Sequence, residues 1–181
     1  MLKVTKSLLV VLAGLGLTLG VASCGEGKAP SPRAASPTTT PTTMLPKPTG
    51  TPVLEITRPG AEPVSADFAT LDGLAHKTYR IVEPFEEKEI AFKGVELWSV
   101  LAAAGVPASA TEIKVTALDD YQVTLSVADL RQGGVILATQ ADGALIPVDH
   151  GGPTRVVFLK DVKAGINPDQ WIWSLKRIAV S

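Results

Sequence analysis

Short apolar runs separated by turn residues recur along residues 53–181. Alternation of apolar and polar side chains with a period of two, bounded by residues that favour turns, is typical of β-strands. The pattern predicts strands at residues 53–56, 77–82, 88–92, 113–117, 122–127, 135–139, 144–148, 154–159 and 171–180. Because these strands do not alternate regularly with helices, the sequence predicts an α+β fold that is mainly β with a mixed sheet.

One helix is clear in the pattern, because apolar residues recur at helical spacing over about 95–104. A glycine and a proline follow it and predict its end. Two shorter helices are predicted from residues that cap helix N-termini. Ser65 is expected to begin a helix at 66–71, and Ser126 has the spacing of a capping box with Asp129, which predicts a single helical turn.

The N-terminal segment differs from the rest of the chain. Residues 1–23 begin with two lysines, continue through an apolar stretch and end in small residues directly before Cys24, which predicts a signal peptide. The apolar stretch is short for a membrane span, which needs about 20 residues. A cysteine at this place resembles the bacterial lipoprotein pattern, in which the thiol is acylated. The alternative is an ordinary secretory signal followed by a chance cysteine.

Residues 24–52 form a segment that cannot build a core. They include seven prolines and seven threonines and no aromatic residue, so we expect a disordered tether followed by one folded domain at 53–181. If Cys24 is acylated, the protein is anchored to membrane lipid in a bacterial cell envelope and faces the periplasm or the cell exterior.

Charge and composition exclude several kinds of function. After residue 23 the chain carries 15 basic and 18 acidic residues, a net charge of −3, which disfavours a nucleic-acid partner. Cys24 is the only cysteine, and the two histidines have no metal-binding spacing, so no metal site is predicted. The sequence has neither a Gly-x-Ser-x-Gly elbow nor a phosphate-binding glycine loop, and no catalytic residue is predicted.

The polar and aromatic residues that remain suggest a binding site. The candidate ligand-binding residues are Asp119, Asp120, Tyr121, His150, Arg155, Trp171 and Trp173. The two aspartates lie at a predicted hairpin tip, where they either favour the turn or accept hydrogen bonds from a donor-rich heterocycle such as the amino-pyrimidinone edge of a pterin. His150 precedes two glycines, whose backbone can approach a ligand closely, although a solvent-facing turn explains it equally well.

The C-terminal candidates also have two interpretations. Arg155 begins an otherwise apolar strand, so its head must reach solvent, a carboxylate or a ligand, and an ion pair with an aspartate of the other loop is one solution. Trp171 and Trp173 are expected on one face of the last strand, because side chains alternate across a strand. They form either part of the core or an aromatic platform for a flat heterocycle.

The order of these motifs resembles the molybdopterin-binding domain of sulfite-oxidase-like oxidoreductases. The resemblance covers about residues 53–180 and rests on the motifs at 92–101, 105, 119–121, 146–157 and 176–180, with tryptophans before the last of them. It implies a mixed, mainly β fold. In the full-size enzymes of this superfamily, a cysteine thiolate and many polar contacts hold a molybdenum–pterin cofactor.

The sequence departs from the full-size enzymes, because the predicted domain is shorter and has no cysteine. It is more similar to a small periplasmic branch whose members bind free pterins and regulate a partner protein. The resemblance therefore implies a pterin or molybdopterin-like ligand without molybdenum, held by the candidate residues, and a membrane sensor or redox protein as partner. Two alternatives remain, a molybdopterin-dependent oxidoreductase or electron-transfer component, and a ligand-free protein–protein adaptor.

Overall fold

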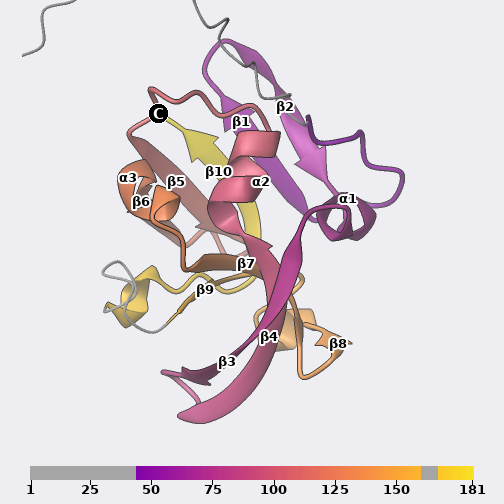
Figure 1. The fold of residues 1–181 in the computed structure, drawn as a ribbon, viewed down its shortest axis with the longest axis vertical. Helices are drawn as coiled ribbons and strands as arrows, with labels where there is room; N and C mark the ends of the chain where they lie inside the picture. The colour runs from indigo at the N-terminus through magenta and orange to yellow at the C-terminus, as the bar shows by residue number, and fades with distance from the viewer. Residues whose placement is uncertain (1–43, 160–166) are drawn as a thin grey trace, which may run out of the picture. The chain divides into compact units, whose positions relative to one another are not determined.

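The computed structural model describes residues 44–159 and 167–181 (Figure 1). The predicted signal peptide, Cys24 and the first part of the predicted tether lie outside these residues. Within the described residues, no helix has the length and apolar character needed to cross a membrane. Contacts with the folded domain begin at Leu45, whose N–H donates to Ala103 O at 2.8 Å, and they continue at Gly50, whose N–H donates to Asp67.

The first sheet is mixed and contains both ends of the folded domain. Its strands are β1 (Leu54–Arg58), β2 (Ala61–Ala66), β5 (Glu112–Ala117), β6 (Gln122–Ser126) and β10 (Leu175–Val180). They lie in the order β2-β1-β10-β5-β6. The β1–β10 pair is parallel, and the other pairs are antiparallel. The first and last strands of the domain are therefore neighbours at the centre of the sheet.

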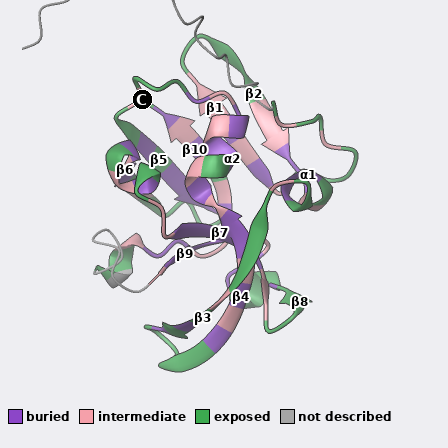
Figure 2. Ribbon diagram, in the orientation of Figure 1, coloured by how far each residue is buried: buried purple, intermediate pink, exposed green. Residues whose placement is uncertain are grey.

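The second sheet is antiparallel. Its strands are β3 (His76–Glu83), β4 (Lys88–Glu96), β7 (Val135–Ala141), β8 (Ala144–Leu145) and β9 (Arg155–Phe158). The order is β3-β4-β7-β8, and β9 also pairs with β7. Most residues at the far end of the β3–β4 hairpin are exposed (Figure 2), although Glu83 at the end of β3 is buried.

The helices are short and connect the strands. They are α1 (Phe68–Asp72), α2 (Leu97–Ala103), α3 (Val127–Arg131) and the 3-10 turns η1 (Val148–His150) and η3 (Pro168–Gln170). The α+β, mainly β prediction is confirmed, and α2 is the helix expected at 95–104. It begins at Leu97 because Val95 and Glu96 still pair with β7 as part of β4.

The two predictions from capping residues have different outcomes. Ser126 caps α3, since its hydroxyl accepts a hydrogen bond from the N–H of Asp129 at 3.4 Å. The prediction for Ser65 is wrong, because this residue lies in β2 opposite Glu55. Asp67 caps α1 instead and accepts from the N–H of Thr70 at 2.7 Å. Because β2 pairs with β1 as far as Ala66, the strand continues past Ser65. Asp67, the next residue that can cap a helix, therefore begins α1.

The strand expected at 171–180 begins only at Leu175, so the prediction that Trp171 and Trp173 share a strand face is wrong. The segment before β10 is irregular, and Ser174 has a φ of 51°. Its backbone is nevertheless tied to the chain around β9. The N–H of Ser174 donates to Gly151 O at 2.6 Å, and the N–H of Val156 donates to Ile172 O at 2.8 Å.

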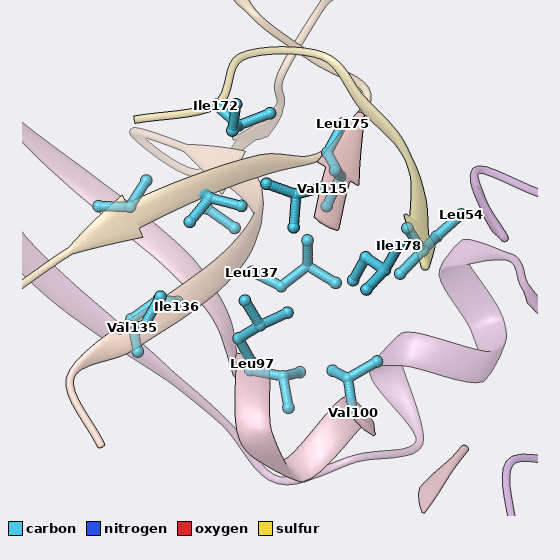
Figure 3. Packing of buried hydrophobic residues seen from close by; sticks show 14 of the residues in the cluster. Leu54, Leu97, Val100, Val115, Val135, Ile136, Leu137, Ile172, Leu175 and Ile178 are labelled. Atoms are coloured by element: carbon cyan, nitrogen blue, oxygen red, sulfur yellow. The ribbon is translucent and has the colours of Figure 1, made fainter. Parts of the chain in front are cut away.

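Buried apolar side chains from both sheets and from α2 form one core. Figure 3 shows Leu97 and Val100 of α2 close to Leu137 of β7 and Ile178 of β10, and all four are fully buried. Each such side chain contributes roughly 1.5–3 kcal/mol when it leaves water. The approach of β4 to β7 requires a glycine, because a Cβ at Gly94 would lie 2.3 Å from a backbone oxygen of β7.

Candidate functional site

A pocket of about 390 Å³ lies where three connecting segments meet. The turn between β3 and β4 contributes Phe85, the β5–β6 connection contributes most of the polar lining, and the segment before β10 contributes two tryptophans. We call it the aromatic pocket, and its lining residues are Phe85, Ala117, Asp119, Tyr121, Asp169, Trp171 and Trp173. Four of the seven are aromatic, so the walls offer mainly flat apolar surface.

Hydrogen bonds between these segments fix the pocket in place. The N–H of Leu118 donates to Ser174 O at 2.8 Å and joins the β5–β6 turn to the tryptophan segment. The hydroxyl of Tyr121 donates to Asp169 O at 2.9 Å and makes a second link between the same segments. A third bond runs from the N–H of Leu175 to Thr154 O at 2.8 Å. The β5–β6 connection and the segment before β10 are therefore linked to each other, and the start of β10 is linked to the residue before β9.

The two aspartates of the β5–β6 turn have different surroundings. Asp119 lines the pocket, and its carboxylate accepts from the N–H of Tyr121 at 3.1 Å. Asp120 does not line it, because its carboxylate pairs with the Nζ of Lys176 at 2.6 Å. The hydrogen bond from Lys176, followed by the positive charge of that residue, lowers the pKa of Asp120 below its ordinary value.

The two tryptophans differ in exposure. Trp171 is 7% exposed and packs against Phe158 with 5.9 Å between ring centroids. Trp173 is half-buried, and the ring of Phe85 meets it edge to face at 5.8 Å. The indole nitrogen of Trp173 is buried and has no hydrogen-bond partner within the described residues. Trp171 therefore belongs largely to the core, whereas Trp173 is the more exposed of the two indoles that line the pocket.

Arg155 supports the pocket from behind Trp173. Its guanidinium carbon lies 4.1 Å from the centroid of the Trp173 ring, and the side chain is 2% exposed. It forms a buried ion pair with Glu83, which is 0% exposed, so its carboxylate partner is a glutamate of β3. Burial lowers the pKa of Arg155, and the charge of Glu83 opposes that change.

His150 is also absent from the pocket lining. It is exposed at the end of η1. The next residue, Gly151, has a φ of 85°, and a Cβ there would lie 2.9 Å from the Trp173 ring. This loop therefore positions the indole through a glycine, while the histidine side chain remains in solvent.

The structure brings four of the seven predicted site residues together in one pocket. These are Asp119, Tyr121, Trp171 and Trp173, whereas Asp120, His150 and Arg155 do not line it. The sequence reasoning missed Phe85, Ala117 and Asp169. Phe85 could have been recognised as a candidate from the sequence, because it is an aromatic residue within a charged turn.

A family model matches the part of the chain that contains the pocket. The model of the oxidoreductase molybdopterin-binding domain matches residues 85–179. The chain belongs to this family. Every residue that lines the aromatic pocket lies within the matched range.

A solved structure shares the fold. Sulfane dehydrogenase SoxCD from Paracoccus pantotrophus is 19% identical with a TM-score of 0.56, over 70% of this chain and 37% of that chain. The chain thus spans well under half the length of that protein. No curated protein matches the sequence.

The residues of this chain do not fit the molybdenum centre of the full-size enzymes. The domain at 53–181 has no cysteine to supply a thiolate. Among the described residues, no group of three or more His, Cys, Asp or Glu side chains could hold a metal ion. The described lining of the pocket includes two carboxylates and no basic side chain. The described lining of the pocket therefore combines aromatic surface with carboxylates and contains no thiolate.

Proposed function

We propose that this protein is a lipid-anchored extracytoplasmic module that binds a pterin or a similar flat heterocycle without catalysing a reaction, and that it regulates a partner protein. The observation that carries the proposal is the aromatic pocket, in which Trp173 and Phe85 provide ring surfaces next to the carboxylate of Asp119. Flat heterocycles stack on indole, and carboxylates accept hydrogen bonds from amino-pyrimidinone donors.

Membership of the molybdopterin-binding family supports the choice of a pterin over other flat ligands. Loss of the thiolate supports binding over oxygen-atom transfer, since the only cysteine of the chain is Cys24. In this proposal the sulfur of Cys24 carries lipid, and the Pro/Thr-rich segment after it holds the domain away from the membrane. The partner in this proposal is a membrane sensor or redox protein in the same envelope.

Ligand binding can be tested with the full chain purified in detergent. Calorimetry against a panel of oxidised and reduced pterins should detect binding in the micromolar range, and Trp173→Ala should weaken it at least tenfold. Trp98→Ala removes a tryptophan outside the pocket lining and serves as the control. Absence of binding to every pterin in the panel would contradict the proposal.

The anchor is tested separately. Metabolic labelling with a fatty acid should mark the wild-type protein, and Cys24→Ser should remove the label and release the protein from membranes. If the Cys24→Ser protein keeps its label and stays in the membrane fraction, the proposed anchor is wrong.

The second candidate function is a molybdopterin-dependent oxidoreductase or electron-transfer component, and family membership is the observation that favours it. Elemental analysis of the protein from molybdenum-replete cells separates it from the first. Molybdenum in a near-stoichiometric amount would support the redox role, and a trace amount would support the binding role. Failure to find either metal or pterin would leave the protein–protein adaptor as the best account.

A further inference from the structure

The described charged residues that line the aromatic pocket are all acidic. Asp119 and Asp169 are both exposed and line it, and none of its described lining residues is lysine, arginine or histidine. Proteins usually hold phosphate groups with arginine, lysine or a row of backbone N–H groups. The described walls of this pocket supply no such side chain.

Among the described residues, Lys176 and Arg155 contact the pocket segments, and both are paired. Lys176 binds the carboxylate of Asp120 at 2.6 Å, and Arg155 binds Glu83. Arg155 is also covered by the ring of Trp173, whose centroid lies 4.1 Å from the guanidinium carbon. Arg155 is buried, and Asp120 balances the charge of Lys176.

Tyr121 contacts both acidic residues of the pocket lining. It donates its N–H to the Asp119 carboxylate at 3.1 Å and its hydroxyl to the backbone oxygen of Asp169 at 2.9 Å. These bonds hold the side chain of Asp119 and the backbone of Asp169 next to an aromatic residue of the pocket. Aromatic faces combined with carboxylates attract cations and repel anions.

We infer that the aromatic pocket selects its ligand by charge and takes a neutral or positively charged flat heterocycle in preference to the phosphorylated form of the same ring. This inference rests on the proposed function, because it concerns the ligand of the same pocket. Molybdopterin carries a phosphate group, so its phosphate would have to lie outside the acidic part of the pocket. The chain therefore prefers the free heterocycle to the phosphorylated group for which its family is named.

The test compares matched ligands by calorimetry on the full chain in detergent. We expect 6-hydroxymethylpterin to bind roughly tenfold more tightly than its monophosphate ester at physiological salt, with a smaller ratio at high salt. In the double variant Asp119→Asn with Asp169→Asn, the ratio of the affinities for 6-hydroxymethylpterin and for its phosphate ester should be close to one. The control double variant, Glu62→Gln with Asp72→Asn, removes the same charge outside the pocket and should keep the ratio.

A second pair of probes separates this inference from the proposed function. The N-methylquinolinium cation should bind at least tenfold more tightly than the quinoline-2-carboxylate anion. If the pterins fail to bind but this pair is discriminated, the charge inference holds and the pterin proposal fails. Equal or tighter binding of the phosphate ester would overturn the charge inference and leave the pterin proposal intact. Absence of binding by all four probes would overturn both.

Discussion

Removing one partner of the buried ion pair between Glu83 and Arg155 is expected to destabilise the protein strongly. Arg155 is 2% exposed and Glu83 is 0% exposed, so removing one charge leaves the other buried without its ion-pair partner. Such a change costs about 3–5 kcal/mol. Glu83→Gln keeps the side-chain shape, and we expect it to lower the melting temperature by roughly 10–20 °C for a domain of this size.

Thermal and urea unfolding followed by circular dichroism measure this loss. The control is Glu89→Gln, which breaks the pair between Glu89 and Arg80. Their side chains are 59% and 73% exposed, so the expected cost is below about 1 kcal/mol. If Glu83→Gln costs no more than Glu89→Gln, the argument from burial is wrong.

The same substitution should also weaken ligand binding. The second oxygen of the Glu83 carboxylate accepts from the N–H of Phe85 at 2.8 Å and from the N–H of Glu86 at 2.6 Å. It thereby holds the Phe85 ring against Trp173. Adding Arg155→Met to Glu83→Gln removes the unpaired charge, and the double variant should be more stable than Glu83→Gln alone. A double variant whose cost equals the sum of the two single costs would show that the residues are not coupled.

Three further predictions concern packing, stacking and pH. Gly94→Ala should cost about 1–3 kcal/mol or more in urea unfolding, because its Cβ would overlap the β7 backbone, whereas Gly73→Ala, which meets only ordinary contacts, should change stability by less than about 1 kcal/mol. Trp173→Phe keeps an aromatic ring, so its affinity for the heterocycle should lie between the affinities of the wild type and of Trp173→Ala. Hydrogen bonds from the Thr70 side chain and from backbone N–H groups hold the pKa of Asp67 well below its ordinary value. The stability that Asp67 contributes is therefore present above about pH 4, where the unfolded carboxyl is also charged, and is lost as pH falls further. Asp67→Asn should reduce the slope of stability against pH in that acid range, and an unchanged slope would contradict the assignment.

The local sequence predicted where the strands form better than it predicted which strands pair with each other. Alternation marked β5 and β6 because their turn residues and apolar faces are consistent with each other. The parallel pairing of β1 with β10 had no local signal, since the two strands are far apart in the chain. The incorrect helix start at Ser65 has the same cause, because a pairing partner decided where β2 ends.

The positions of the site residues were also hard to predict from local sequence, because long-range contacts determine them. The alternation of Trp171 and Trp173 fits a strand, but hydrogen bonds to the chain around β9 hold this segment in an irregular path. Asp119 and Asp120 are adjacent in sequence, and only the position of Lys176 and the φ of 69° at Asp120 determine which one lines the pocket. Residue type thus predicted four of the seven lining residues, and tertiary contacts determined which candidates line the pocket.

The family match begins at Phe85, yet the site depends on residues before it. Glu83 forms the ion pair with Arg155, and it also fixes the turn that carries Phe85. β1 and β3, which precede the match, pair with β10 and β4. Because Arg155 in turn lies against the Trp173 ring, the N-terminal strands act on the pocket without contacting its interior. The structural unit that forms the aromatic pocket is therefore longer than the matched sequence, and it includes the strands that lead to Glu83.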